Sequence, residues 1–436
     1  MSVGVLPDLD ANRPLTLPLQ AEVTLPSGLT IIAIQRPSIP LVELRLRVPF
    51  AQAPLAASAL MAQTLFSGTS GKSSVELAAE LQTVGGGLGA GIDPDRLLIS
   101  GNALTSGLDR LLELLAEVLH DATYPVHEVV TERDRLVDRI QVALSQPSHL
   151  ARVALLKRVY DTHPYAVQTP GVEEVRAIDV EHLRQLHAQR LHPAGATLVL
   201  VGDIDPEEAL RTAADRLGSW NGGGSSLDLP QAPPLSPGPL VLVDRPGAVQ
   251  SSLRLALPAV PRTSPDHAAL QLANLIFGGY FSSRWVENIR EDKGYTYGPH
   301  SILEHSVAGS LLVVSAEVAT EVTAPALVET LYELGRLAVL PPTEAELDQA
   351  RQYALGTLQL GMSTQSGLAG LASTYAGFGL RLNYLADHAI RLEAASLDDV
   401  RRTARTYLAP SRAVIVVLGD AAKIRDEVAA IVPVAS

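Results

Sequence analysis

Three short segments of this sequence carry residue types that could do chemistry, and in each the spacing argues against a site. Ser67–Ser74 resembles a phosphate-binding loop but lacks that loop's first glycine, so the start of a helix is expected instead. Gly85–Gly91 has G-x-G spacing but follows a helix, whereas a dinucleotide site needs a preceding strand. His300, Glu304 and His305 resemble a zinc motif. On the strand expected there, His305 points away from the other two, which predicts solvated side chains.

Composition excludes several further kinds of site. The 436 residues include no cysteine, so disulfides, thiolate nucleophiles and cysteine-bound zinc are absent. A net charge of −13 leaves no surplus of cations for nucleic acid. No apolar run approaches the ~20 residues of a membrane span, and residues 1–20 show no signal-peptide pattern. We therefore expect a cytoplasmic protein with neither nucleic acid nor membrane as partner.

The chain divides at a segment rich in Gly, Ser and Pro. Residues 222–239 read GGGSSLDLPQAPPLSPGP and interrupt the apolar periodicity on either side. Such a composition is typical of a linker between two packed halves. We predict a first domain at 1–221 and a second domain at 240–436.

The two halves repeat one another. Pro193–Asp203 reads PAGATLVLVGD, and Pro410–Asp420 reads PSRAVIVVLGD in the same register. Near the start of each half, LRLRVP at Leu44–Pro49 matches LRLALP at Leu253–Pro258. The repeats indicate a tandem duplication.

The elements of each half predict an α+β fold. Leu44–Val48 alternates apolar and charged residues, the pattern of a strand buried on one face. Capping boxes at Ser73–Glu76 and Thr343–Glu346 open helices. Strands group with strands and helices with helices, without the strict alternation of a doubly wound sheet. We therefore expect two structurally similar α/β-sandwich halves.

Over almost its whole length the sequence resembles the M16 family of zinc metallopeptidases, the inverzincins that include mitochondrial processing peptidase. The resemblance rests on four segments in the family's order, namely Leu25–Val48, Ala59–Thr69, Thr162–Asp179 and Gly278–Gly298. It implies the M16 fold and a site for peptides.

The active-site helix of that family departs from its pattern here. Active members carry H-x-x-E-H, in which two histidines bind Zn²⁺ and the glutamate acts as general base. Aligned on the shared L-F-x-G-T, this chain has Ala59, Ala62 and Gln63 at those three positions, and Arg139 stands where a glutamate would supply the third ligand. Alanine has no donor atom and a guanidinium repels a cation. We expect no metal in this chain and no hydrolysis by it alone.

Two other features of the family are retained in whole or in part. Arg290 and Tyr297 match the Arg/Tyr pair that binds the peptide and polarises its carbonyl. The alternative is an ordinary surface ion pair for Arg290 and packing of Tyr297 on a strand. Gly89, Ala90 and Gly91 lie where the family has an edge strand that pairs with the substrate. A flexible turn is the alternative there.

The resemblance implies two functions. In the first, the chain is the non-catalytic subunit of a heterodimeric M16 peptidase, and it supplies Arg290 and Tyr297 to a zinc-bearing partner with H-x-x-E-H. In the second, it is a homodimeric peptide-binding or structural scaffold without a role in proteolysis.

Overall fold

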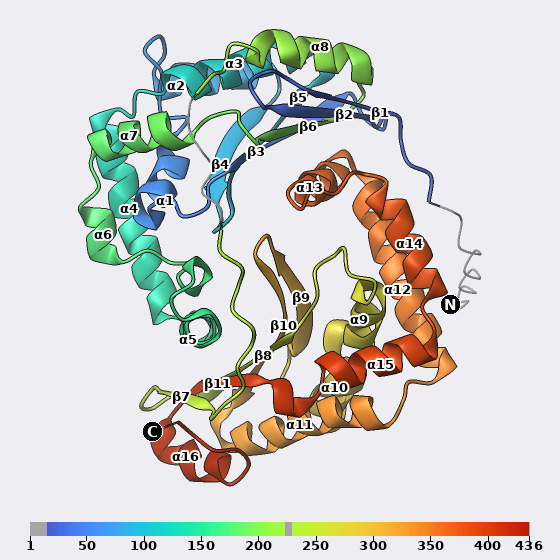
Figure 1. The fold of residues 1–436 in the computed structure, drawn as a ribbon. Helices are drawn as coiled ribbons and strands as arrows, with labels where there is room; N and C mark the ends of the chain where they lie inside the picture. The colour runs from blue at the N-terminus through green and yellow to red at the C-terminus, as the bar shows by residue number, and fades with distance from the viewer. Residues whose placement is uncertain (1–14, 223–228, 436) are drawn as a thin grey trace, which may run out of the picture.

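The computed structural model describes residues 15–222 and 229–435, which form two sheets with helices around them (Figure 1). The first sheet has the strand order β1-β2-β6-β3-β5-β4. Its strands are β1 (Gln20–Thr24), β2 (Thr30–Gln35), β3 (Leu41–Pro49), β4 (Gly87–Ile92), β5 (Arg96–Leu104) and β6 (Thr197–Gly202). The second sheet has the order β7-β11-β8-β10-β9. Its strands are β7 (Val241–Asp244), β8 (Gln250–Pro258), β9 (His300–Ser306), β10 (Gly309–Ala319) and β11 (Val414–Gly419).

The helices divide between the halves as the strands do. Those before the linker are α1 (Leu55–Thr64), α2 (Ser74–Thr83), α3 (Leu108–Asp121), α4 (Val126–Ser145), α5 (Pro147–Tyr160), α6 (Val172–Arg176), α7 (Val180–Arg190) and α8 (Pro206–Leu217). Those after it are α9 (His267–Asn274), α10 (Arg284–Val286), α11 (Thr323–Val339), α12 (Glu344–Ser363), α13 (Gln365–Ala376), α14 (Tyr384–Ala394), α15 (Leu397–Tyr407) and α16 (Ala421–Ala429).

The two sheets correspond strand for strand once β1 is set aside. β2 pairs with β6 in parallel and β7 pairs with β11 in parallel, while every other pair in both sheets is antiparallel. The repeated segments noted in the sequence fall on equivalent strands, β6 with β11 and β3 with β8. The predicted α+β fold with two similar halves is therefore confirmed.

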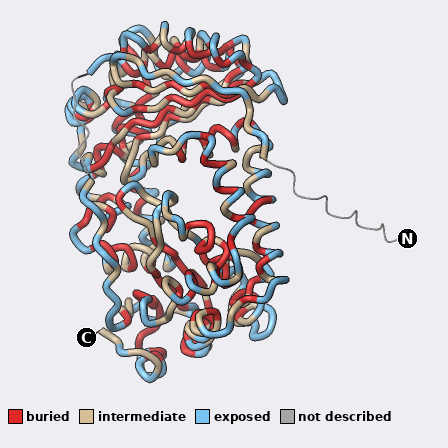
Figure 2. The backbone as a smooth tube through the Cα atoms, turned by 45° about the vertical axis from the view of Figure 1, so that its right-hand side comes forward, coloured by how far each residue is buried: buried red, intermediate tan, exposed pale blue. Residues whose placement is uncertain are grey.

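Local signals place the helix starts as expected. Ser73 accepts from the Glu76 N–H and Thr343 from the Glu346 N–H, so both predicted capping boxes form. The main core of each half lies between its sheet and its own helices. Figure 2 shows buried backbone running along the strands of the upper sheet.

One helix of each half lies on the sheet of the other half. Leu155 and Val159 of α5 pack against β11 and other strands of the second sheet. Leu368 and Ala372 of α13 pack against the first sheet, where they meet Val199 of β6. Because this exchange is reciprocal, each half covers part of the second face of the other half's sheet, and the two halves share these outer cores (Figure 1).

This exchange changes the environment of β3, whose polar face was expected to meet solvent. Arg45 donates to the Ser366 hydroxyl of α13 at 2.9 Å, and Arg47 is only 8% exposed. The apolar face of β3 is buried as expected, with Leu44, Leu46 and Val48 inaccessible to solvent, and the polar face is largely covered as well.

The segment between the halves is only partly described. Its glycine- and serine-rich portion, 223–228, lies outside the described residues. The proline-rich portion is held to the body of the protein, since the Pro230 carbonyl lies 2.9 Å from His163 Nε2 and the Ala232 N–H donates to the Ala308 carbonyl. All first-sheet strands precede the segment and all second-sheet strands follow it. The boundaries 1–221, 222–239 and 240–436 stay a prediction.

Across residues 15–222 and 229–435, no helix combines the length and the apolar composition that crossing a membrane requires.

Candidate functional site

The positions of the family's zinc ligands lie on α1 and α4. Ala62 is buried at 4% exposure within the first core, Ala59 is half-buried against it, and Gln63 points to solvent. Arg139 lies on α4, the helix against which α1 packs. The Arg139 side chain is half exposed and lies 3.9 Å from a Glu132 carboxylate oxygen.

These residues do not fit a zinc ion. Two methyl groups, one exposed amide and one guanidinium provide no set of imidazole, thiolate or carboxylate donors. In the described part of the chain, no group of three His, Asp or Glu side chains has the geometry to hold a metal ion. We therefore derive no chemical step through zinc in this chain.

Arg290 and Tyr297 lie together on the second half. Arg290 belongs to a π-helical turn, Glu287–Asp292, which continues α10, and such turns recur at functional sites. Its guanidinium carbon lies 4.4 Å from the centre of the Phe281 ring and 4.9 Å from that of Tyr297. The three side chains thus form a stacked group, with each cation–π contact contributing about 0.5–1 kcal/mol.

Arg290 and Tyr297 of this group line a groove of about 680 Å³. Tyr297 is 86% exposed and Phe281 is 59% exposed. Arg290 also makes the surface ion pair expected as the simpler alternative, at 3.2 Å from Glu291. The groove therefore presents a guanidinium and a phenol hydroxyl to anything that binds over it.

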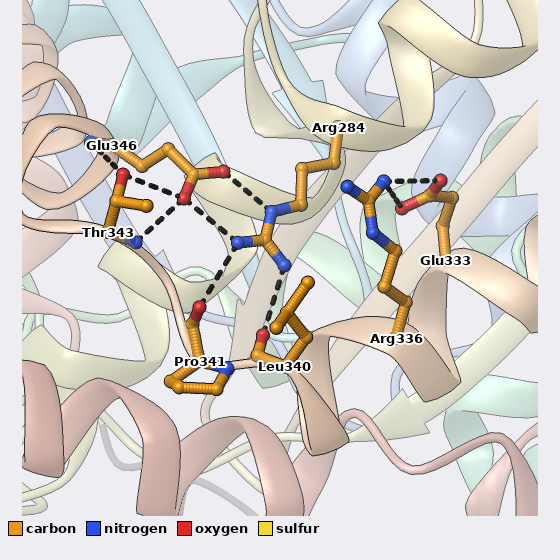
Figure 3. A network of polar contacts seen from close by, with 7 residues as sticks. All are labelled: Arg284, Glu333, Arg336, Leu340, Pro341, Thr343 and Glu346. Atoms are coloured by element: carbon orange, nitrogen blue, oxygen red, sulfur yellow. Dashed lines mark hydrogen bonds and ion pairs between the residues drawn. The ribbon is translucent and has the colours of Figure 1, made fainter.

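Polar contacts hold the helix that carries Arg290 in place (Figure 3). Arg284, whose side chain is 9% exposed, donates to both Glu346 oxygens at 2.6 and 2.8 Å and to the Leu340 carbonyl at 3.1 Å. Asn288 donates to Glu333, which also pairs with Arg336. The start of α10 is thereby fixed to α11 and α12.

The Glu346 carboxylate stays ionised in this network. Burial acts to raise its pKa, but the hydrogen bonds from Arg284 and Thr343 outweigh burial and lower the pKa to about 2. The capping box seen in the sequence therefore has a second role, since the same carboxylate that caps α12 also anchors α10.

Gly89, Ala90 and Gly91 lie in β4, the edge strand of the first sheet. The alternative of a flexible turn is therefore wrong. Gly89 and Gly91 are exposed, and a Cβ at either position would meet no atom within 4 Å. The space over the sheet at both glycines is open, and β4 is the terminal strand of its sheet, which is where another extended chain could add.

The structure brings only some of the sequence-derived residues together. Arg290 and Tyr297 share one groove, and Gly89, Ala90 and Gly91 share one edge. Arg290 and Tyr297 lie on the second half, while β4 and α1 lie on the first half (Figure 1). The two sets of residues therefore belong to different halves of the chain.

Three histidines of the second half lie together without any signal in the sequence; His267 and His388 are buried, and His305 is half-buried beside them. His267 Nε2 lies 3.2 Å from His305 Nε2, and the His388 ring lies 5.0 Å from that of His267. His300 is exposed as predicted, but Glu304 and His305 are only partly exposed, and they contact Arg152 and His267 respectively, so the expectation of solvated side chains is wrong for these two. These residues are 38 and 83 positions apart in the sequence, which leaves no periodic signal.

All three histidines are held neutral. Burial first, and then the neighbouring charged groups, lower the pKa of His267 to about 2, of His305 to about 3 and of His388 to about 4. For His267 these groups are first the imidazoles of His388 and His305 and then two guanidinium groups, and for His388 they are the guanidinium groups of Arg391 and Arg262.

Comparisons with known proteins agree with this architecture. Residues 57–171 match the family model described as Insulinase (Peptidase family M16), and residues 177–353 match the model described as Peptidase M16 inactive domain. An uncharacterized zinc protease of Mycobacterium bovis is 25% identical over 401 residues, covering 88% of this chain and 90% of that protein.

Two solved structures share the fold. A peptidase M16 inactive domain from Pseudomonas fluorescens has a TM-score of 0.83 and 25% identity, covering 92% of this chain and 98% of that one. A protease from Helicobacter pylori has a TM-score of 0.84 and 19% identity, covering 92% of this chain and all of the other.

The duplicated α+β halves and the metal-ligand helix without ligands define a peptidase-like protein of the inactive type. The chain belongs to the M16 peptidase family.

Proposed function

We propose that this chain is the non-catalytic subunit of a two-chain M16 peptidase, and that it supplies Arg290 and Tyr297 to a partner carrying H-x-x-E-H. The observation that carries the proposal is the exposed Arg290–Tyr297 group, held in place although α1 offers no zinc ligands. Zinc would reside in the partner chain.

The chemistry of the pair suits this role. A guanidinium and a phenol hydroxyl both donate hydrogen bonds to an oxygen that gains negative charge, as a scissile carbonyl does during attack by water. Stacking between two rings limits the motion of Arg290, so less orientational entropy is lost when a peptide binds. The ion pair of Arg284 with Glu346 fixes α10 and so also limits the motion of Arg290.

β4 supports a second contact with peptide. Its free edge offers main-chain hydrogen bonds to an extended chain, and its glycines leave room for the bound backbone. In our proposal this edge holds substrate by its backbone, without selecting side chains.

The test is a reconstituted pair of this chain with an H-x-x-E-H homologue from the same cells. Tyr297→Phe should lower kcat by about 10²–10³, the usual effect of removing one transition-state donor. Tyr332→Phe is the matched control, because Tyr332 is also exposed, at 57%, but lies on α11 at a different groove. Its kcat should equal that of the wild type.

Two outcomes would contradict the proposal. In one, Tyr297→Phe leaves kcat unchanged in an active pair. In the other, the chain purified from its native cells has no zinc-binding partner and associates only with itself. The second outcome would favour the homodimeric peptide-binding or scaffold function.

A further inference from the structure

A cavity of about 430 Å³ lies where the two halves of the chain meet. The first half contributes the end of β3, the start of α1 and the β4–β5 turn, and the second half contributes the end of β9 and the segment around Phe378. Its volume falls within the range of small-molecule sites, about 300–1,000 Å³. Part of the wall is apolar, formed by Leu55, Ile92 and Phe378.

Arg47 is the unusual residue of the cavity wall. It is 8% exposed, and its guanidinium lies against the Gly377 backbone after α13. A Cβ at Gly377 would come within 1.8 Å of Arg47 Nη1, so only glycine leaves room for the guanidinium. Within residues 15–222 and 229–435, Arg47 makes no hydrogen bond and has no carboxylate within 4.0 Å.

The other charged side chains of the wall have direct partners. Asp93 pairs with Arg96 at 2.7 Å, Glu304 with Arg152 at 2.6 Å, and Asp95 accepts from the Tyr165 hydroxyl and from the Val307 N–H. Asp93 and Asp95 attract the Arg47 guanidinium only from beyond contact distance. A buried cation without a direct partner is unfavourable, and an anion entering the cavity would relieve this.

We infer that this cavity binds a carboxylate with an apolar body, with the carboxylate paired to Arg47. A planar guanidinium matches a carboxylate through two parallel hydrogen bonds, and burial strengthens both. The apolar wall accommodates the remainder of the ligand. The group comes either from a free acid the size of an amino acid or from the C-terminal residue of a peptide. The inference does not depend on the proposed partner chain.

Calorimetric titration of the full chain tests the inference with two matched pairs of probes. The first pair is N-acetyl-leucine and N-acetyl-leucinamide, and the second is Ala-Ala-Leu and its C-terminal amide. Each acid should bind at least about tenfold more tightly than its amide, because charge-assisted bonds are the stronger ones. If Ala-Ala-Leu binds more tightly than N-acetyl-leucine, the natural ligand is the C-terminal residue of a peptide. If N-acetyl-leucine binds more tightly, the natural ligand is a free acid.

Three variants assign the effect to Arg47. Arg47→Gln should weaken binding of the acids at least about tenfold and remove the preference over the amides. Gly377→Ala should weaken it as well, because the new Cβ displaces the guanidinium. Arg45→Gln is the matched control, since Arg45 lies on the same face of β3 but already pairs with Glu43 at 2.8 Å. It should bind like the wild type.

The comparison of acid with amide uses wild-type protein, so it stands even if a variant fails to fold. The inference is wrong if the amides bind as tightly as the acids, or if neither acid binds at about 10 mM. Inorganic phosphate that binds more tightly than either acid would also overturn the assignment to a carboxylate.

Discussion

Mild acid should destabilise this protein through His267, His305 and His388. In the folded chain their pKa values are lowered to about 2, 3 and 4. In the unfolded chain each returns to about 6.5. As the pH falls through 6.5 the unfolded state gains protons and the folded state does not, so stability is lost as the pH falls.

The size of the effect follows from the number of protons. Near pH 5 the unfolded chain binds almost three more protons at these positions than the folded chain, and each is worth about 1.4 kcal/mol per pH unit. The free energy of unfolding should therefore fall by up to about 4 kcal/mol for each unit between about pH 6 and pH 5. That is a large share of the ~5–15 kcal/mol typical of a folded protein.

Urea unfolding at intervals across this range provides the measurement. His388→Gln keeps a polar side chain near Gln271 but does not titrate, so the pH slope should fall by about 1.4 kcal/mol per unit. His127→Gln is the control, because the His127 side chain is 80% exposed. If wild-type stability were constant between about pH 6 and pH 5, the three histidines would not be held neutral and our reasoning would be refuted.

Two further predictions concern stability. Arg284→Met should destabilise the protein by about 1–3 kcal/mol in urea unfolding, because it leaves the half-buried Glu346 carboxylate without its cation. Arg135→Met should change stability by less than about 1 kcal/mol, because the Arg135 side chain is 64% exposed. Equal losses of stability in the two variants would show that burial does not increase the contribution of the Arg284–Glu346 pair. Gly202→Ala should lower the free energy of unfolding by about 1–3 kcal/mol, because its Cβ would lie 2.4 Å from the Leu41 carbonyl oxygen. Gly89→Ala is the control and should leave the free energy of unfolding unchanged, because its Cβ would meet no atom within 4 Å. An unchanged stability for Gly202→Ala would show that the neighbouring strands separate easily.

Much of the fold was predictable because its signals are local. The capping boxes of α2 and α12 each involve residues three positions apart. The repeated segments that end in Gly-Asp mark β6 and β11. In β6 that glycine is Gly202, which lies so close to β3 that a larger side chain would not fit. Such patterns act within a few residues, so they remain visible without the tertiary structure.

The loss of zinc ligands was likewise decided by sequence alone. Whether a position carries a donor atom depends on residue type, and no folding can give Ala59 or Ala62 a ligand. The roles proposed for Arg290 and Tyr297 began from resemblance. The structure adds the contacts of Arg290 with the rings of Phe281 and Tyr297, and the anchoring by Arg284 of the helix that carries Arg290.

Only the tertiary structure revealed the features that depend on distant segments. α5 and α13 exchange between the halves, and this covers the face of β3 that alternation had assigned to solvent and buries Arg47. The histidine group joins α9, β9 and α14. Periodicity records which face of an element is apolar, but it does not record which distant element covers the other face. The sequence therefore determined the elements and the loss of metal ligands, and packing between segments far apart in the chain decided which arginine became buried and which histidines became neutral.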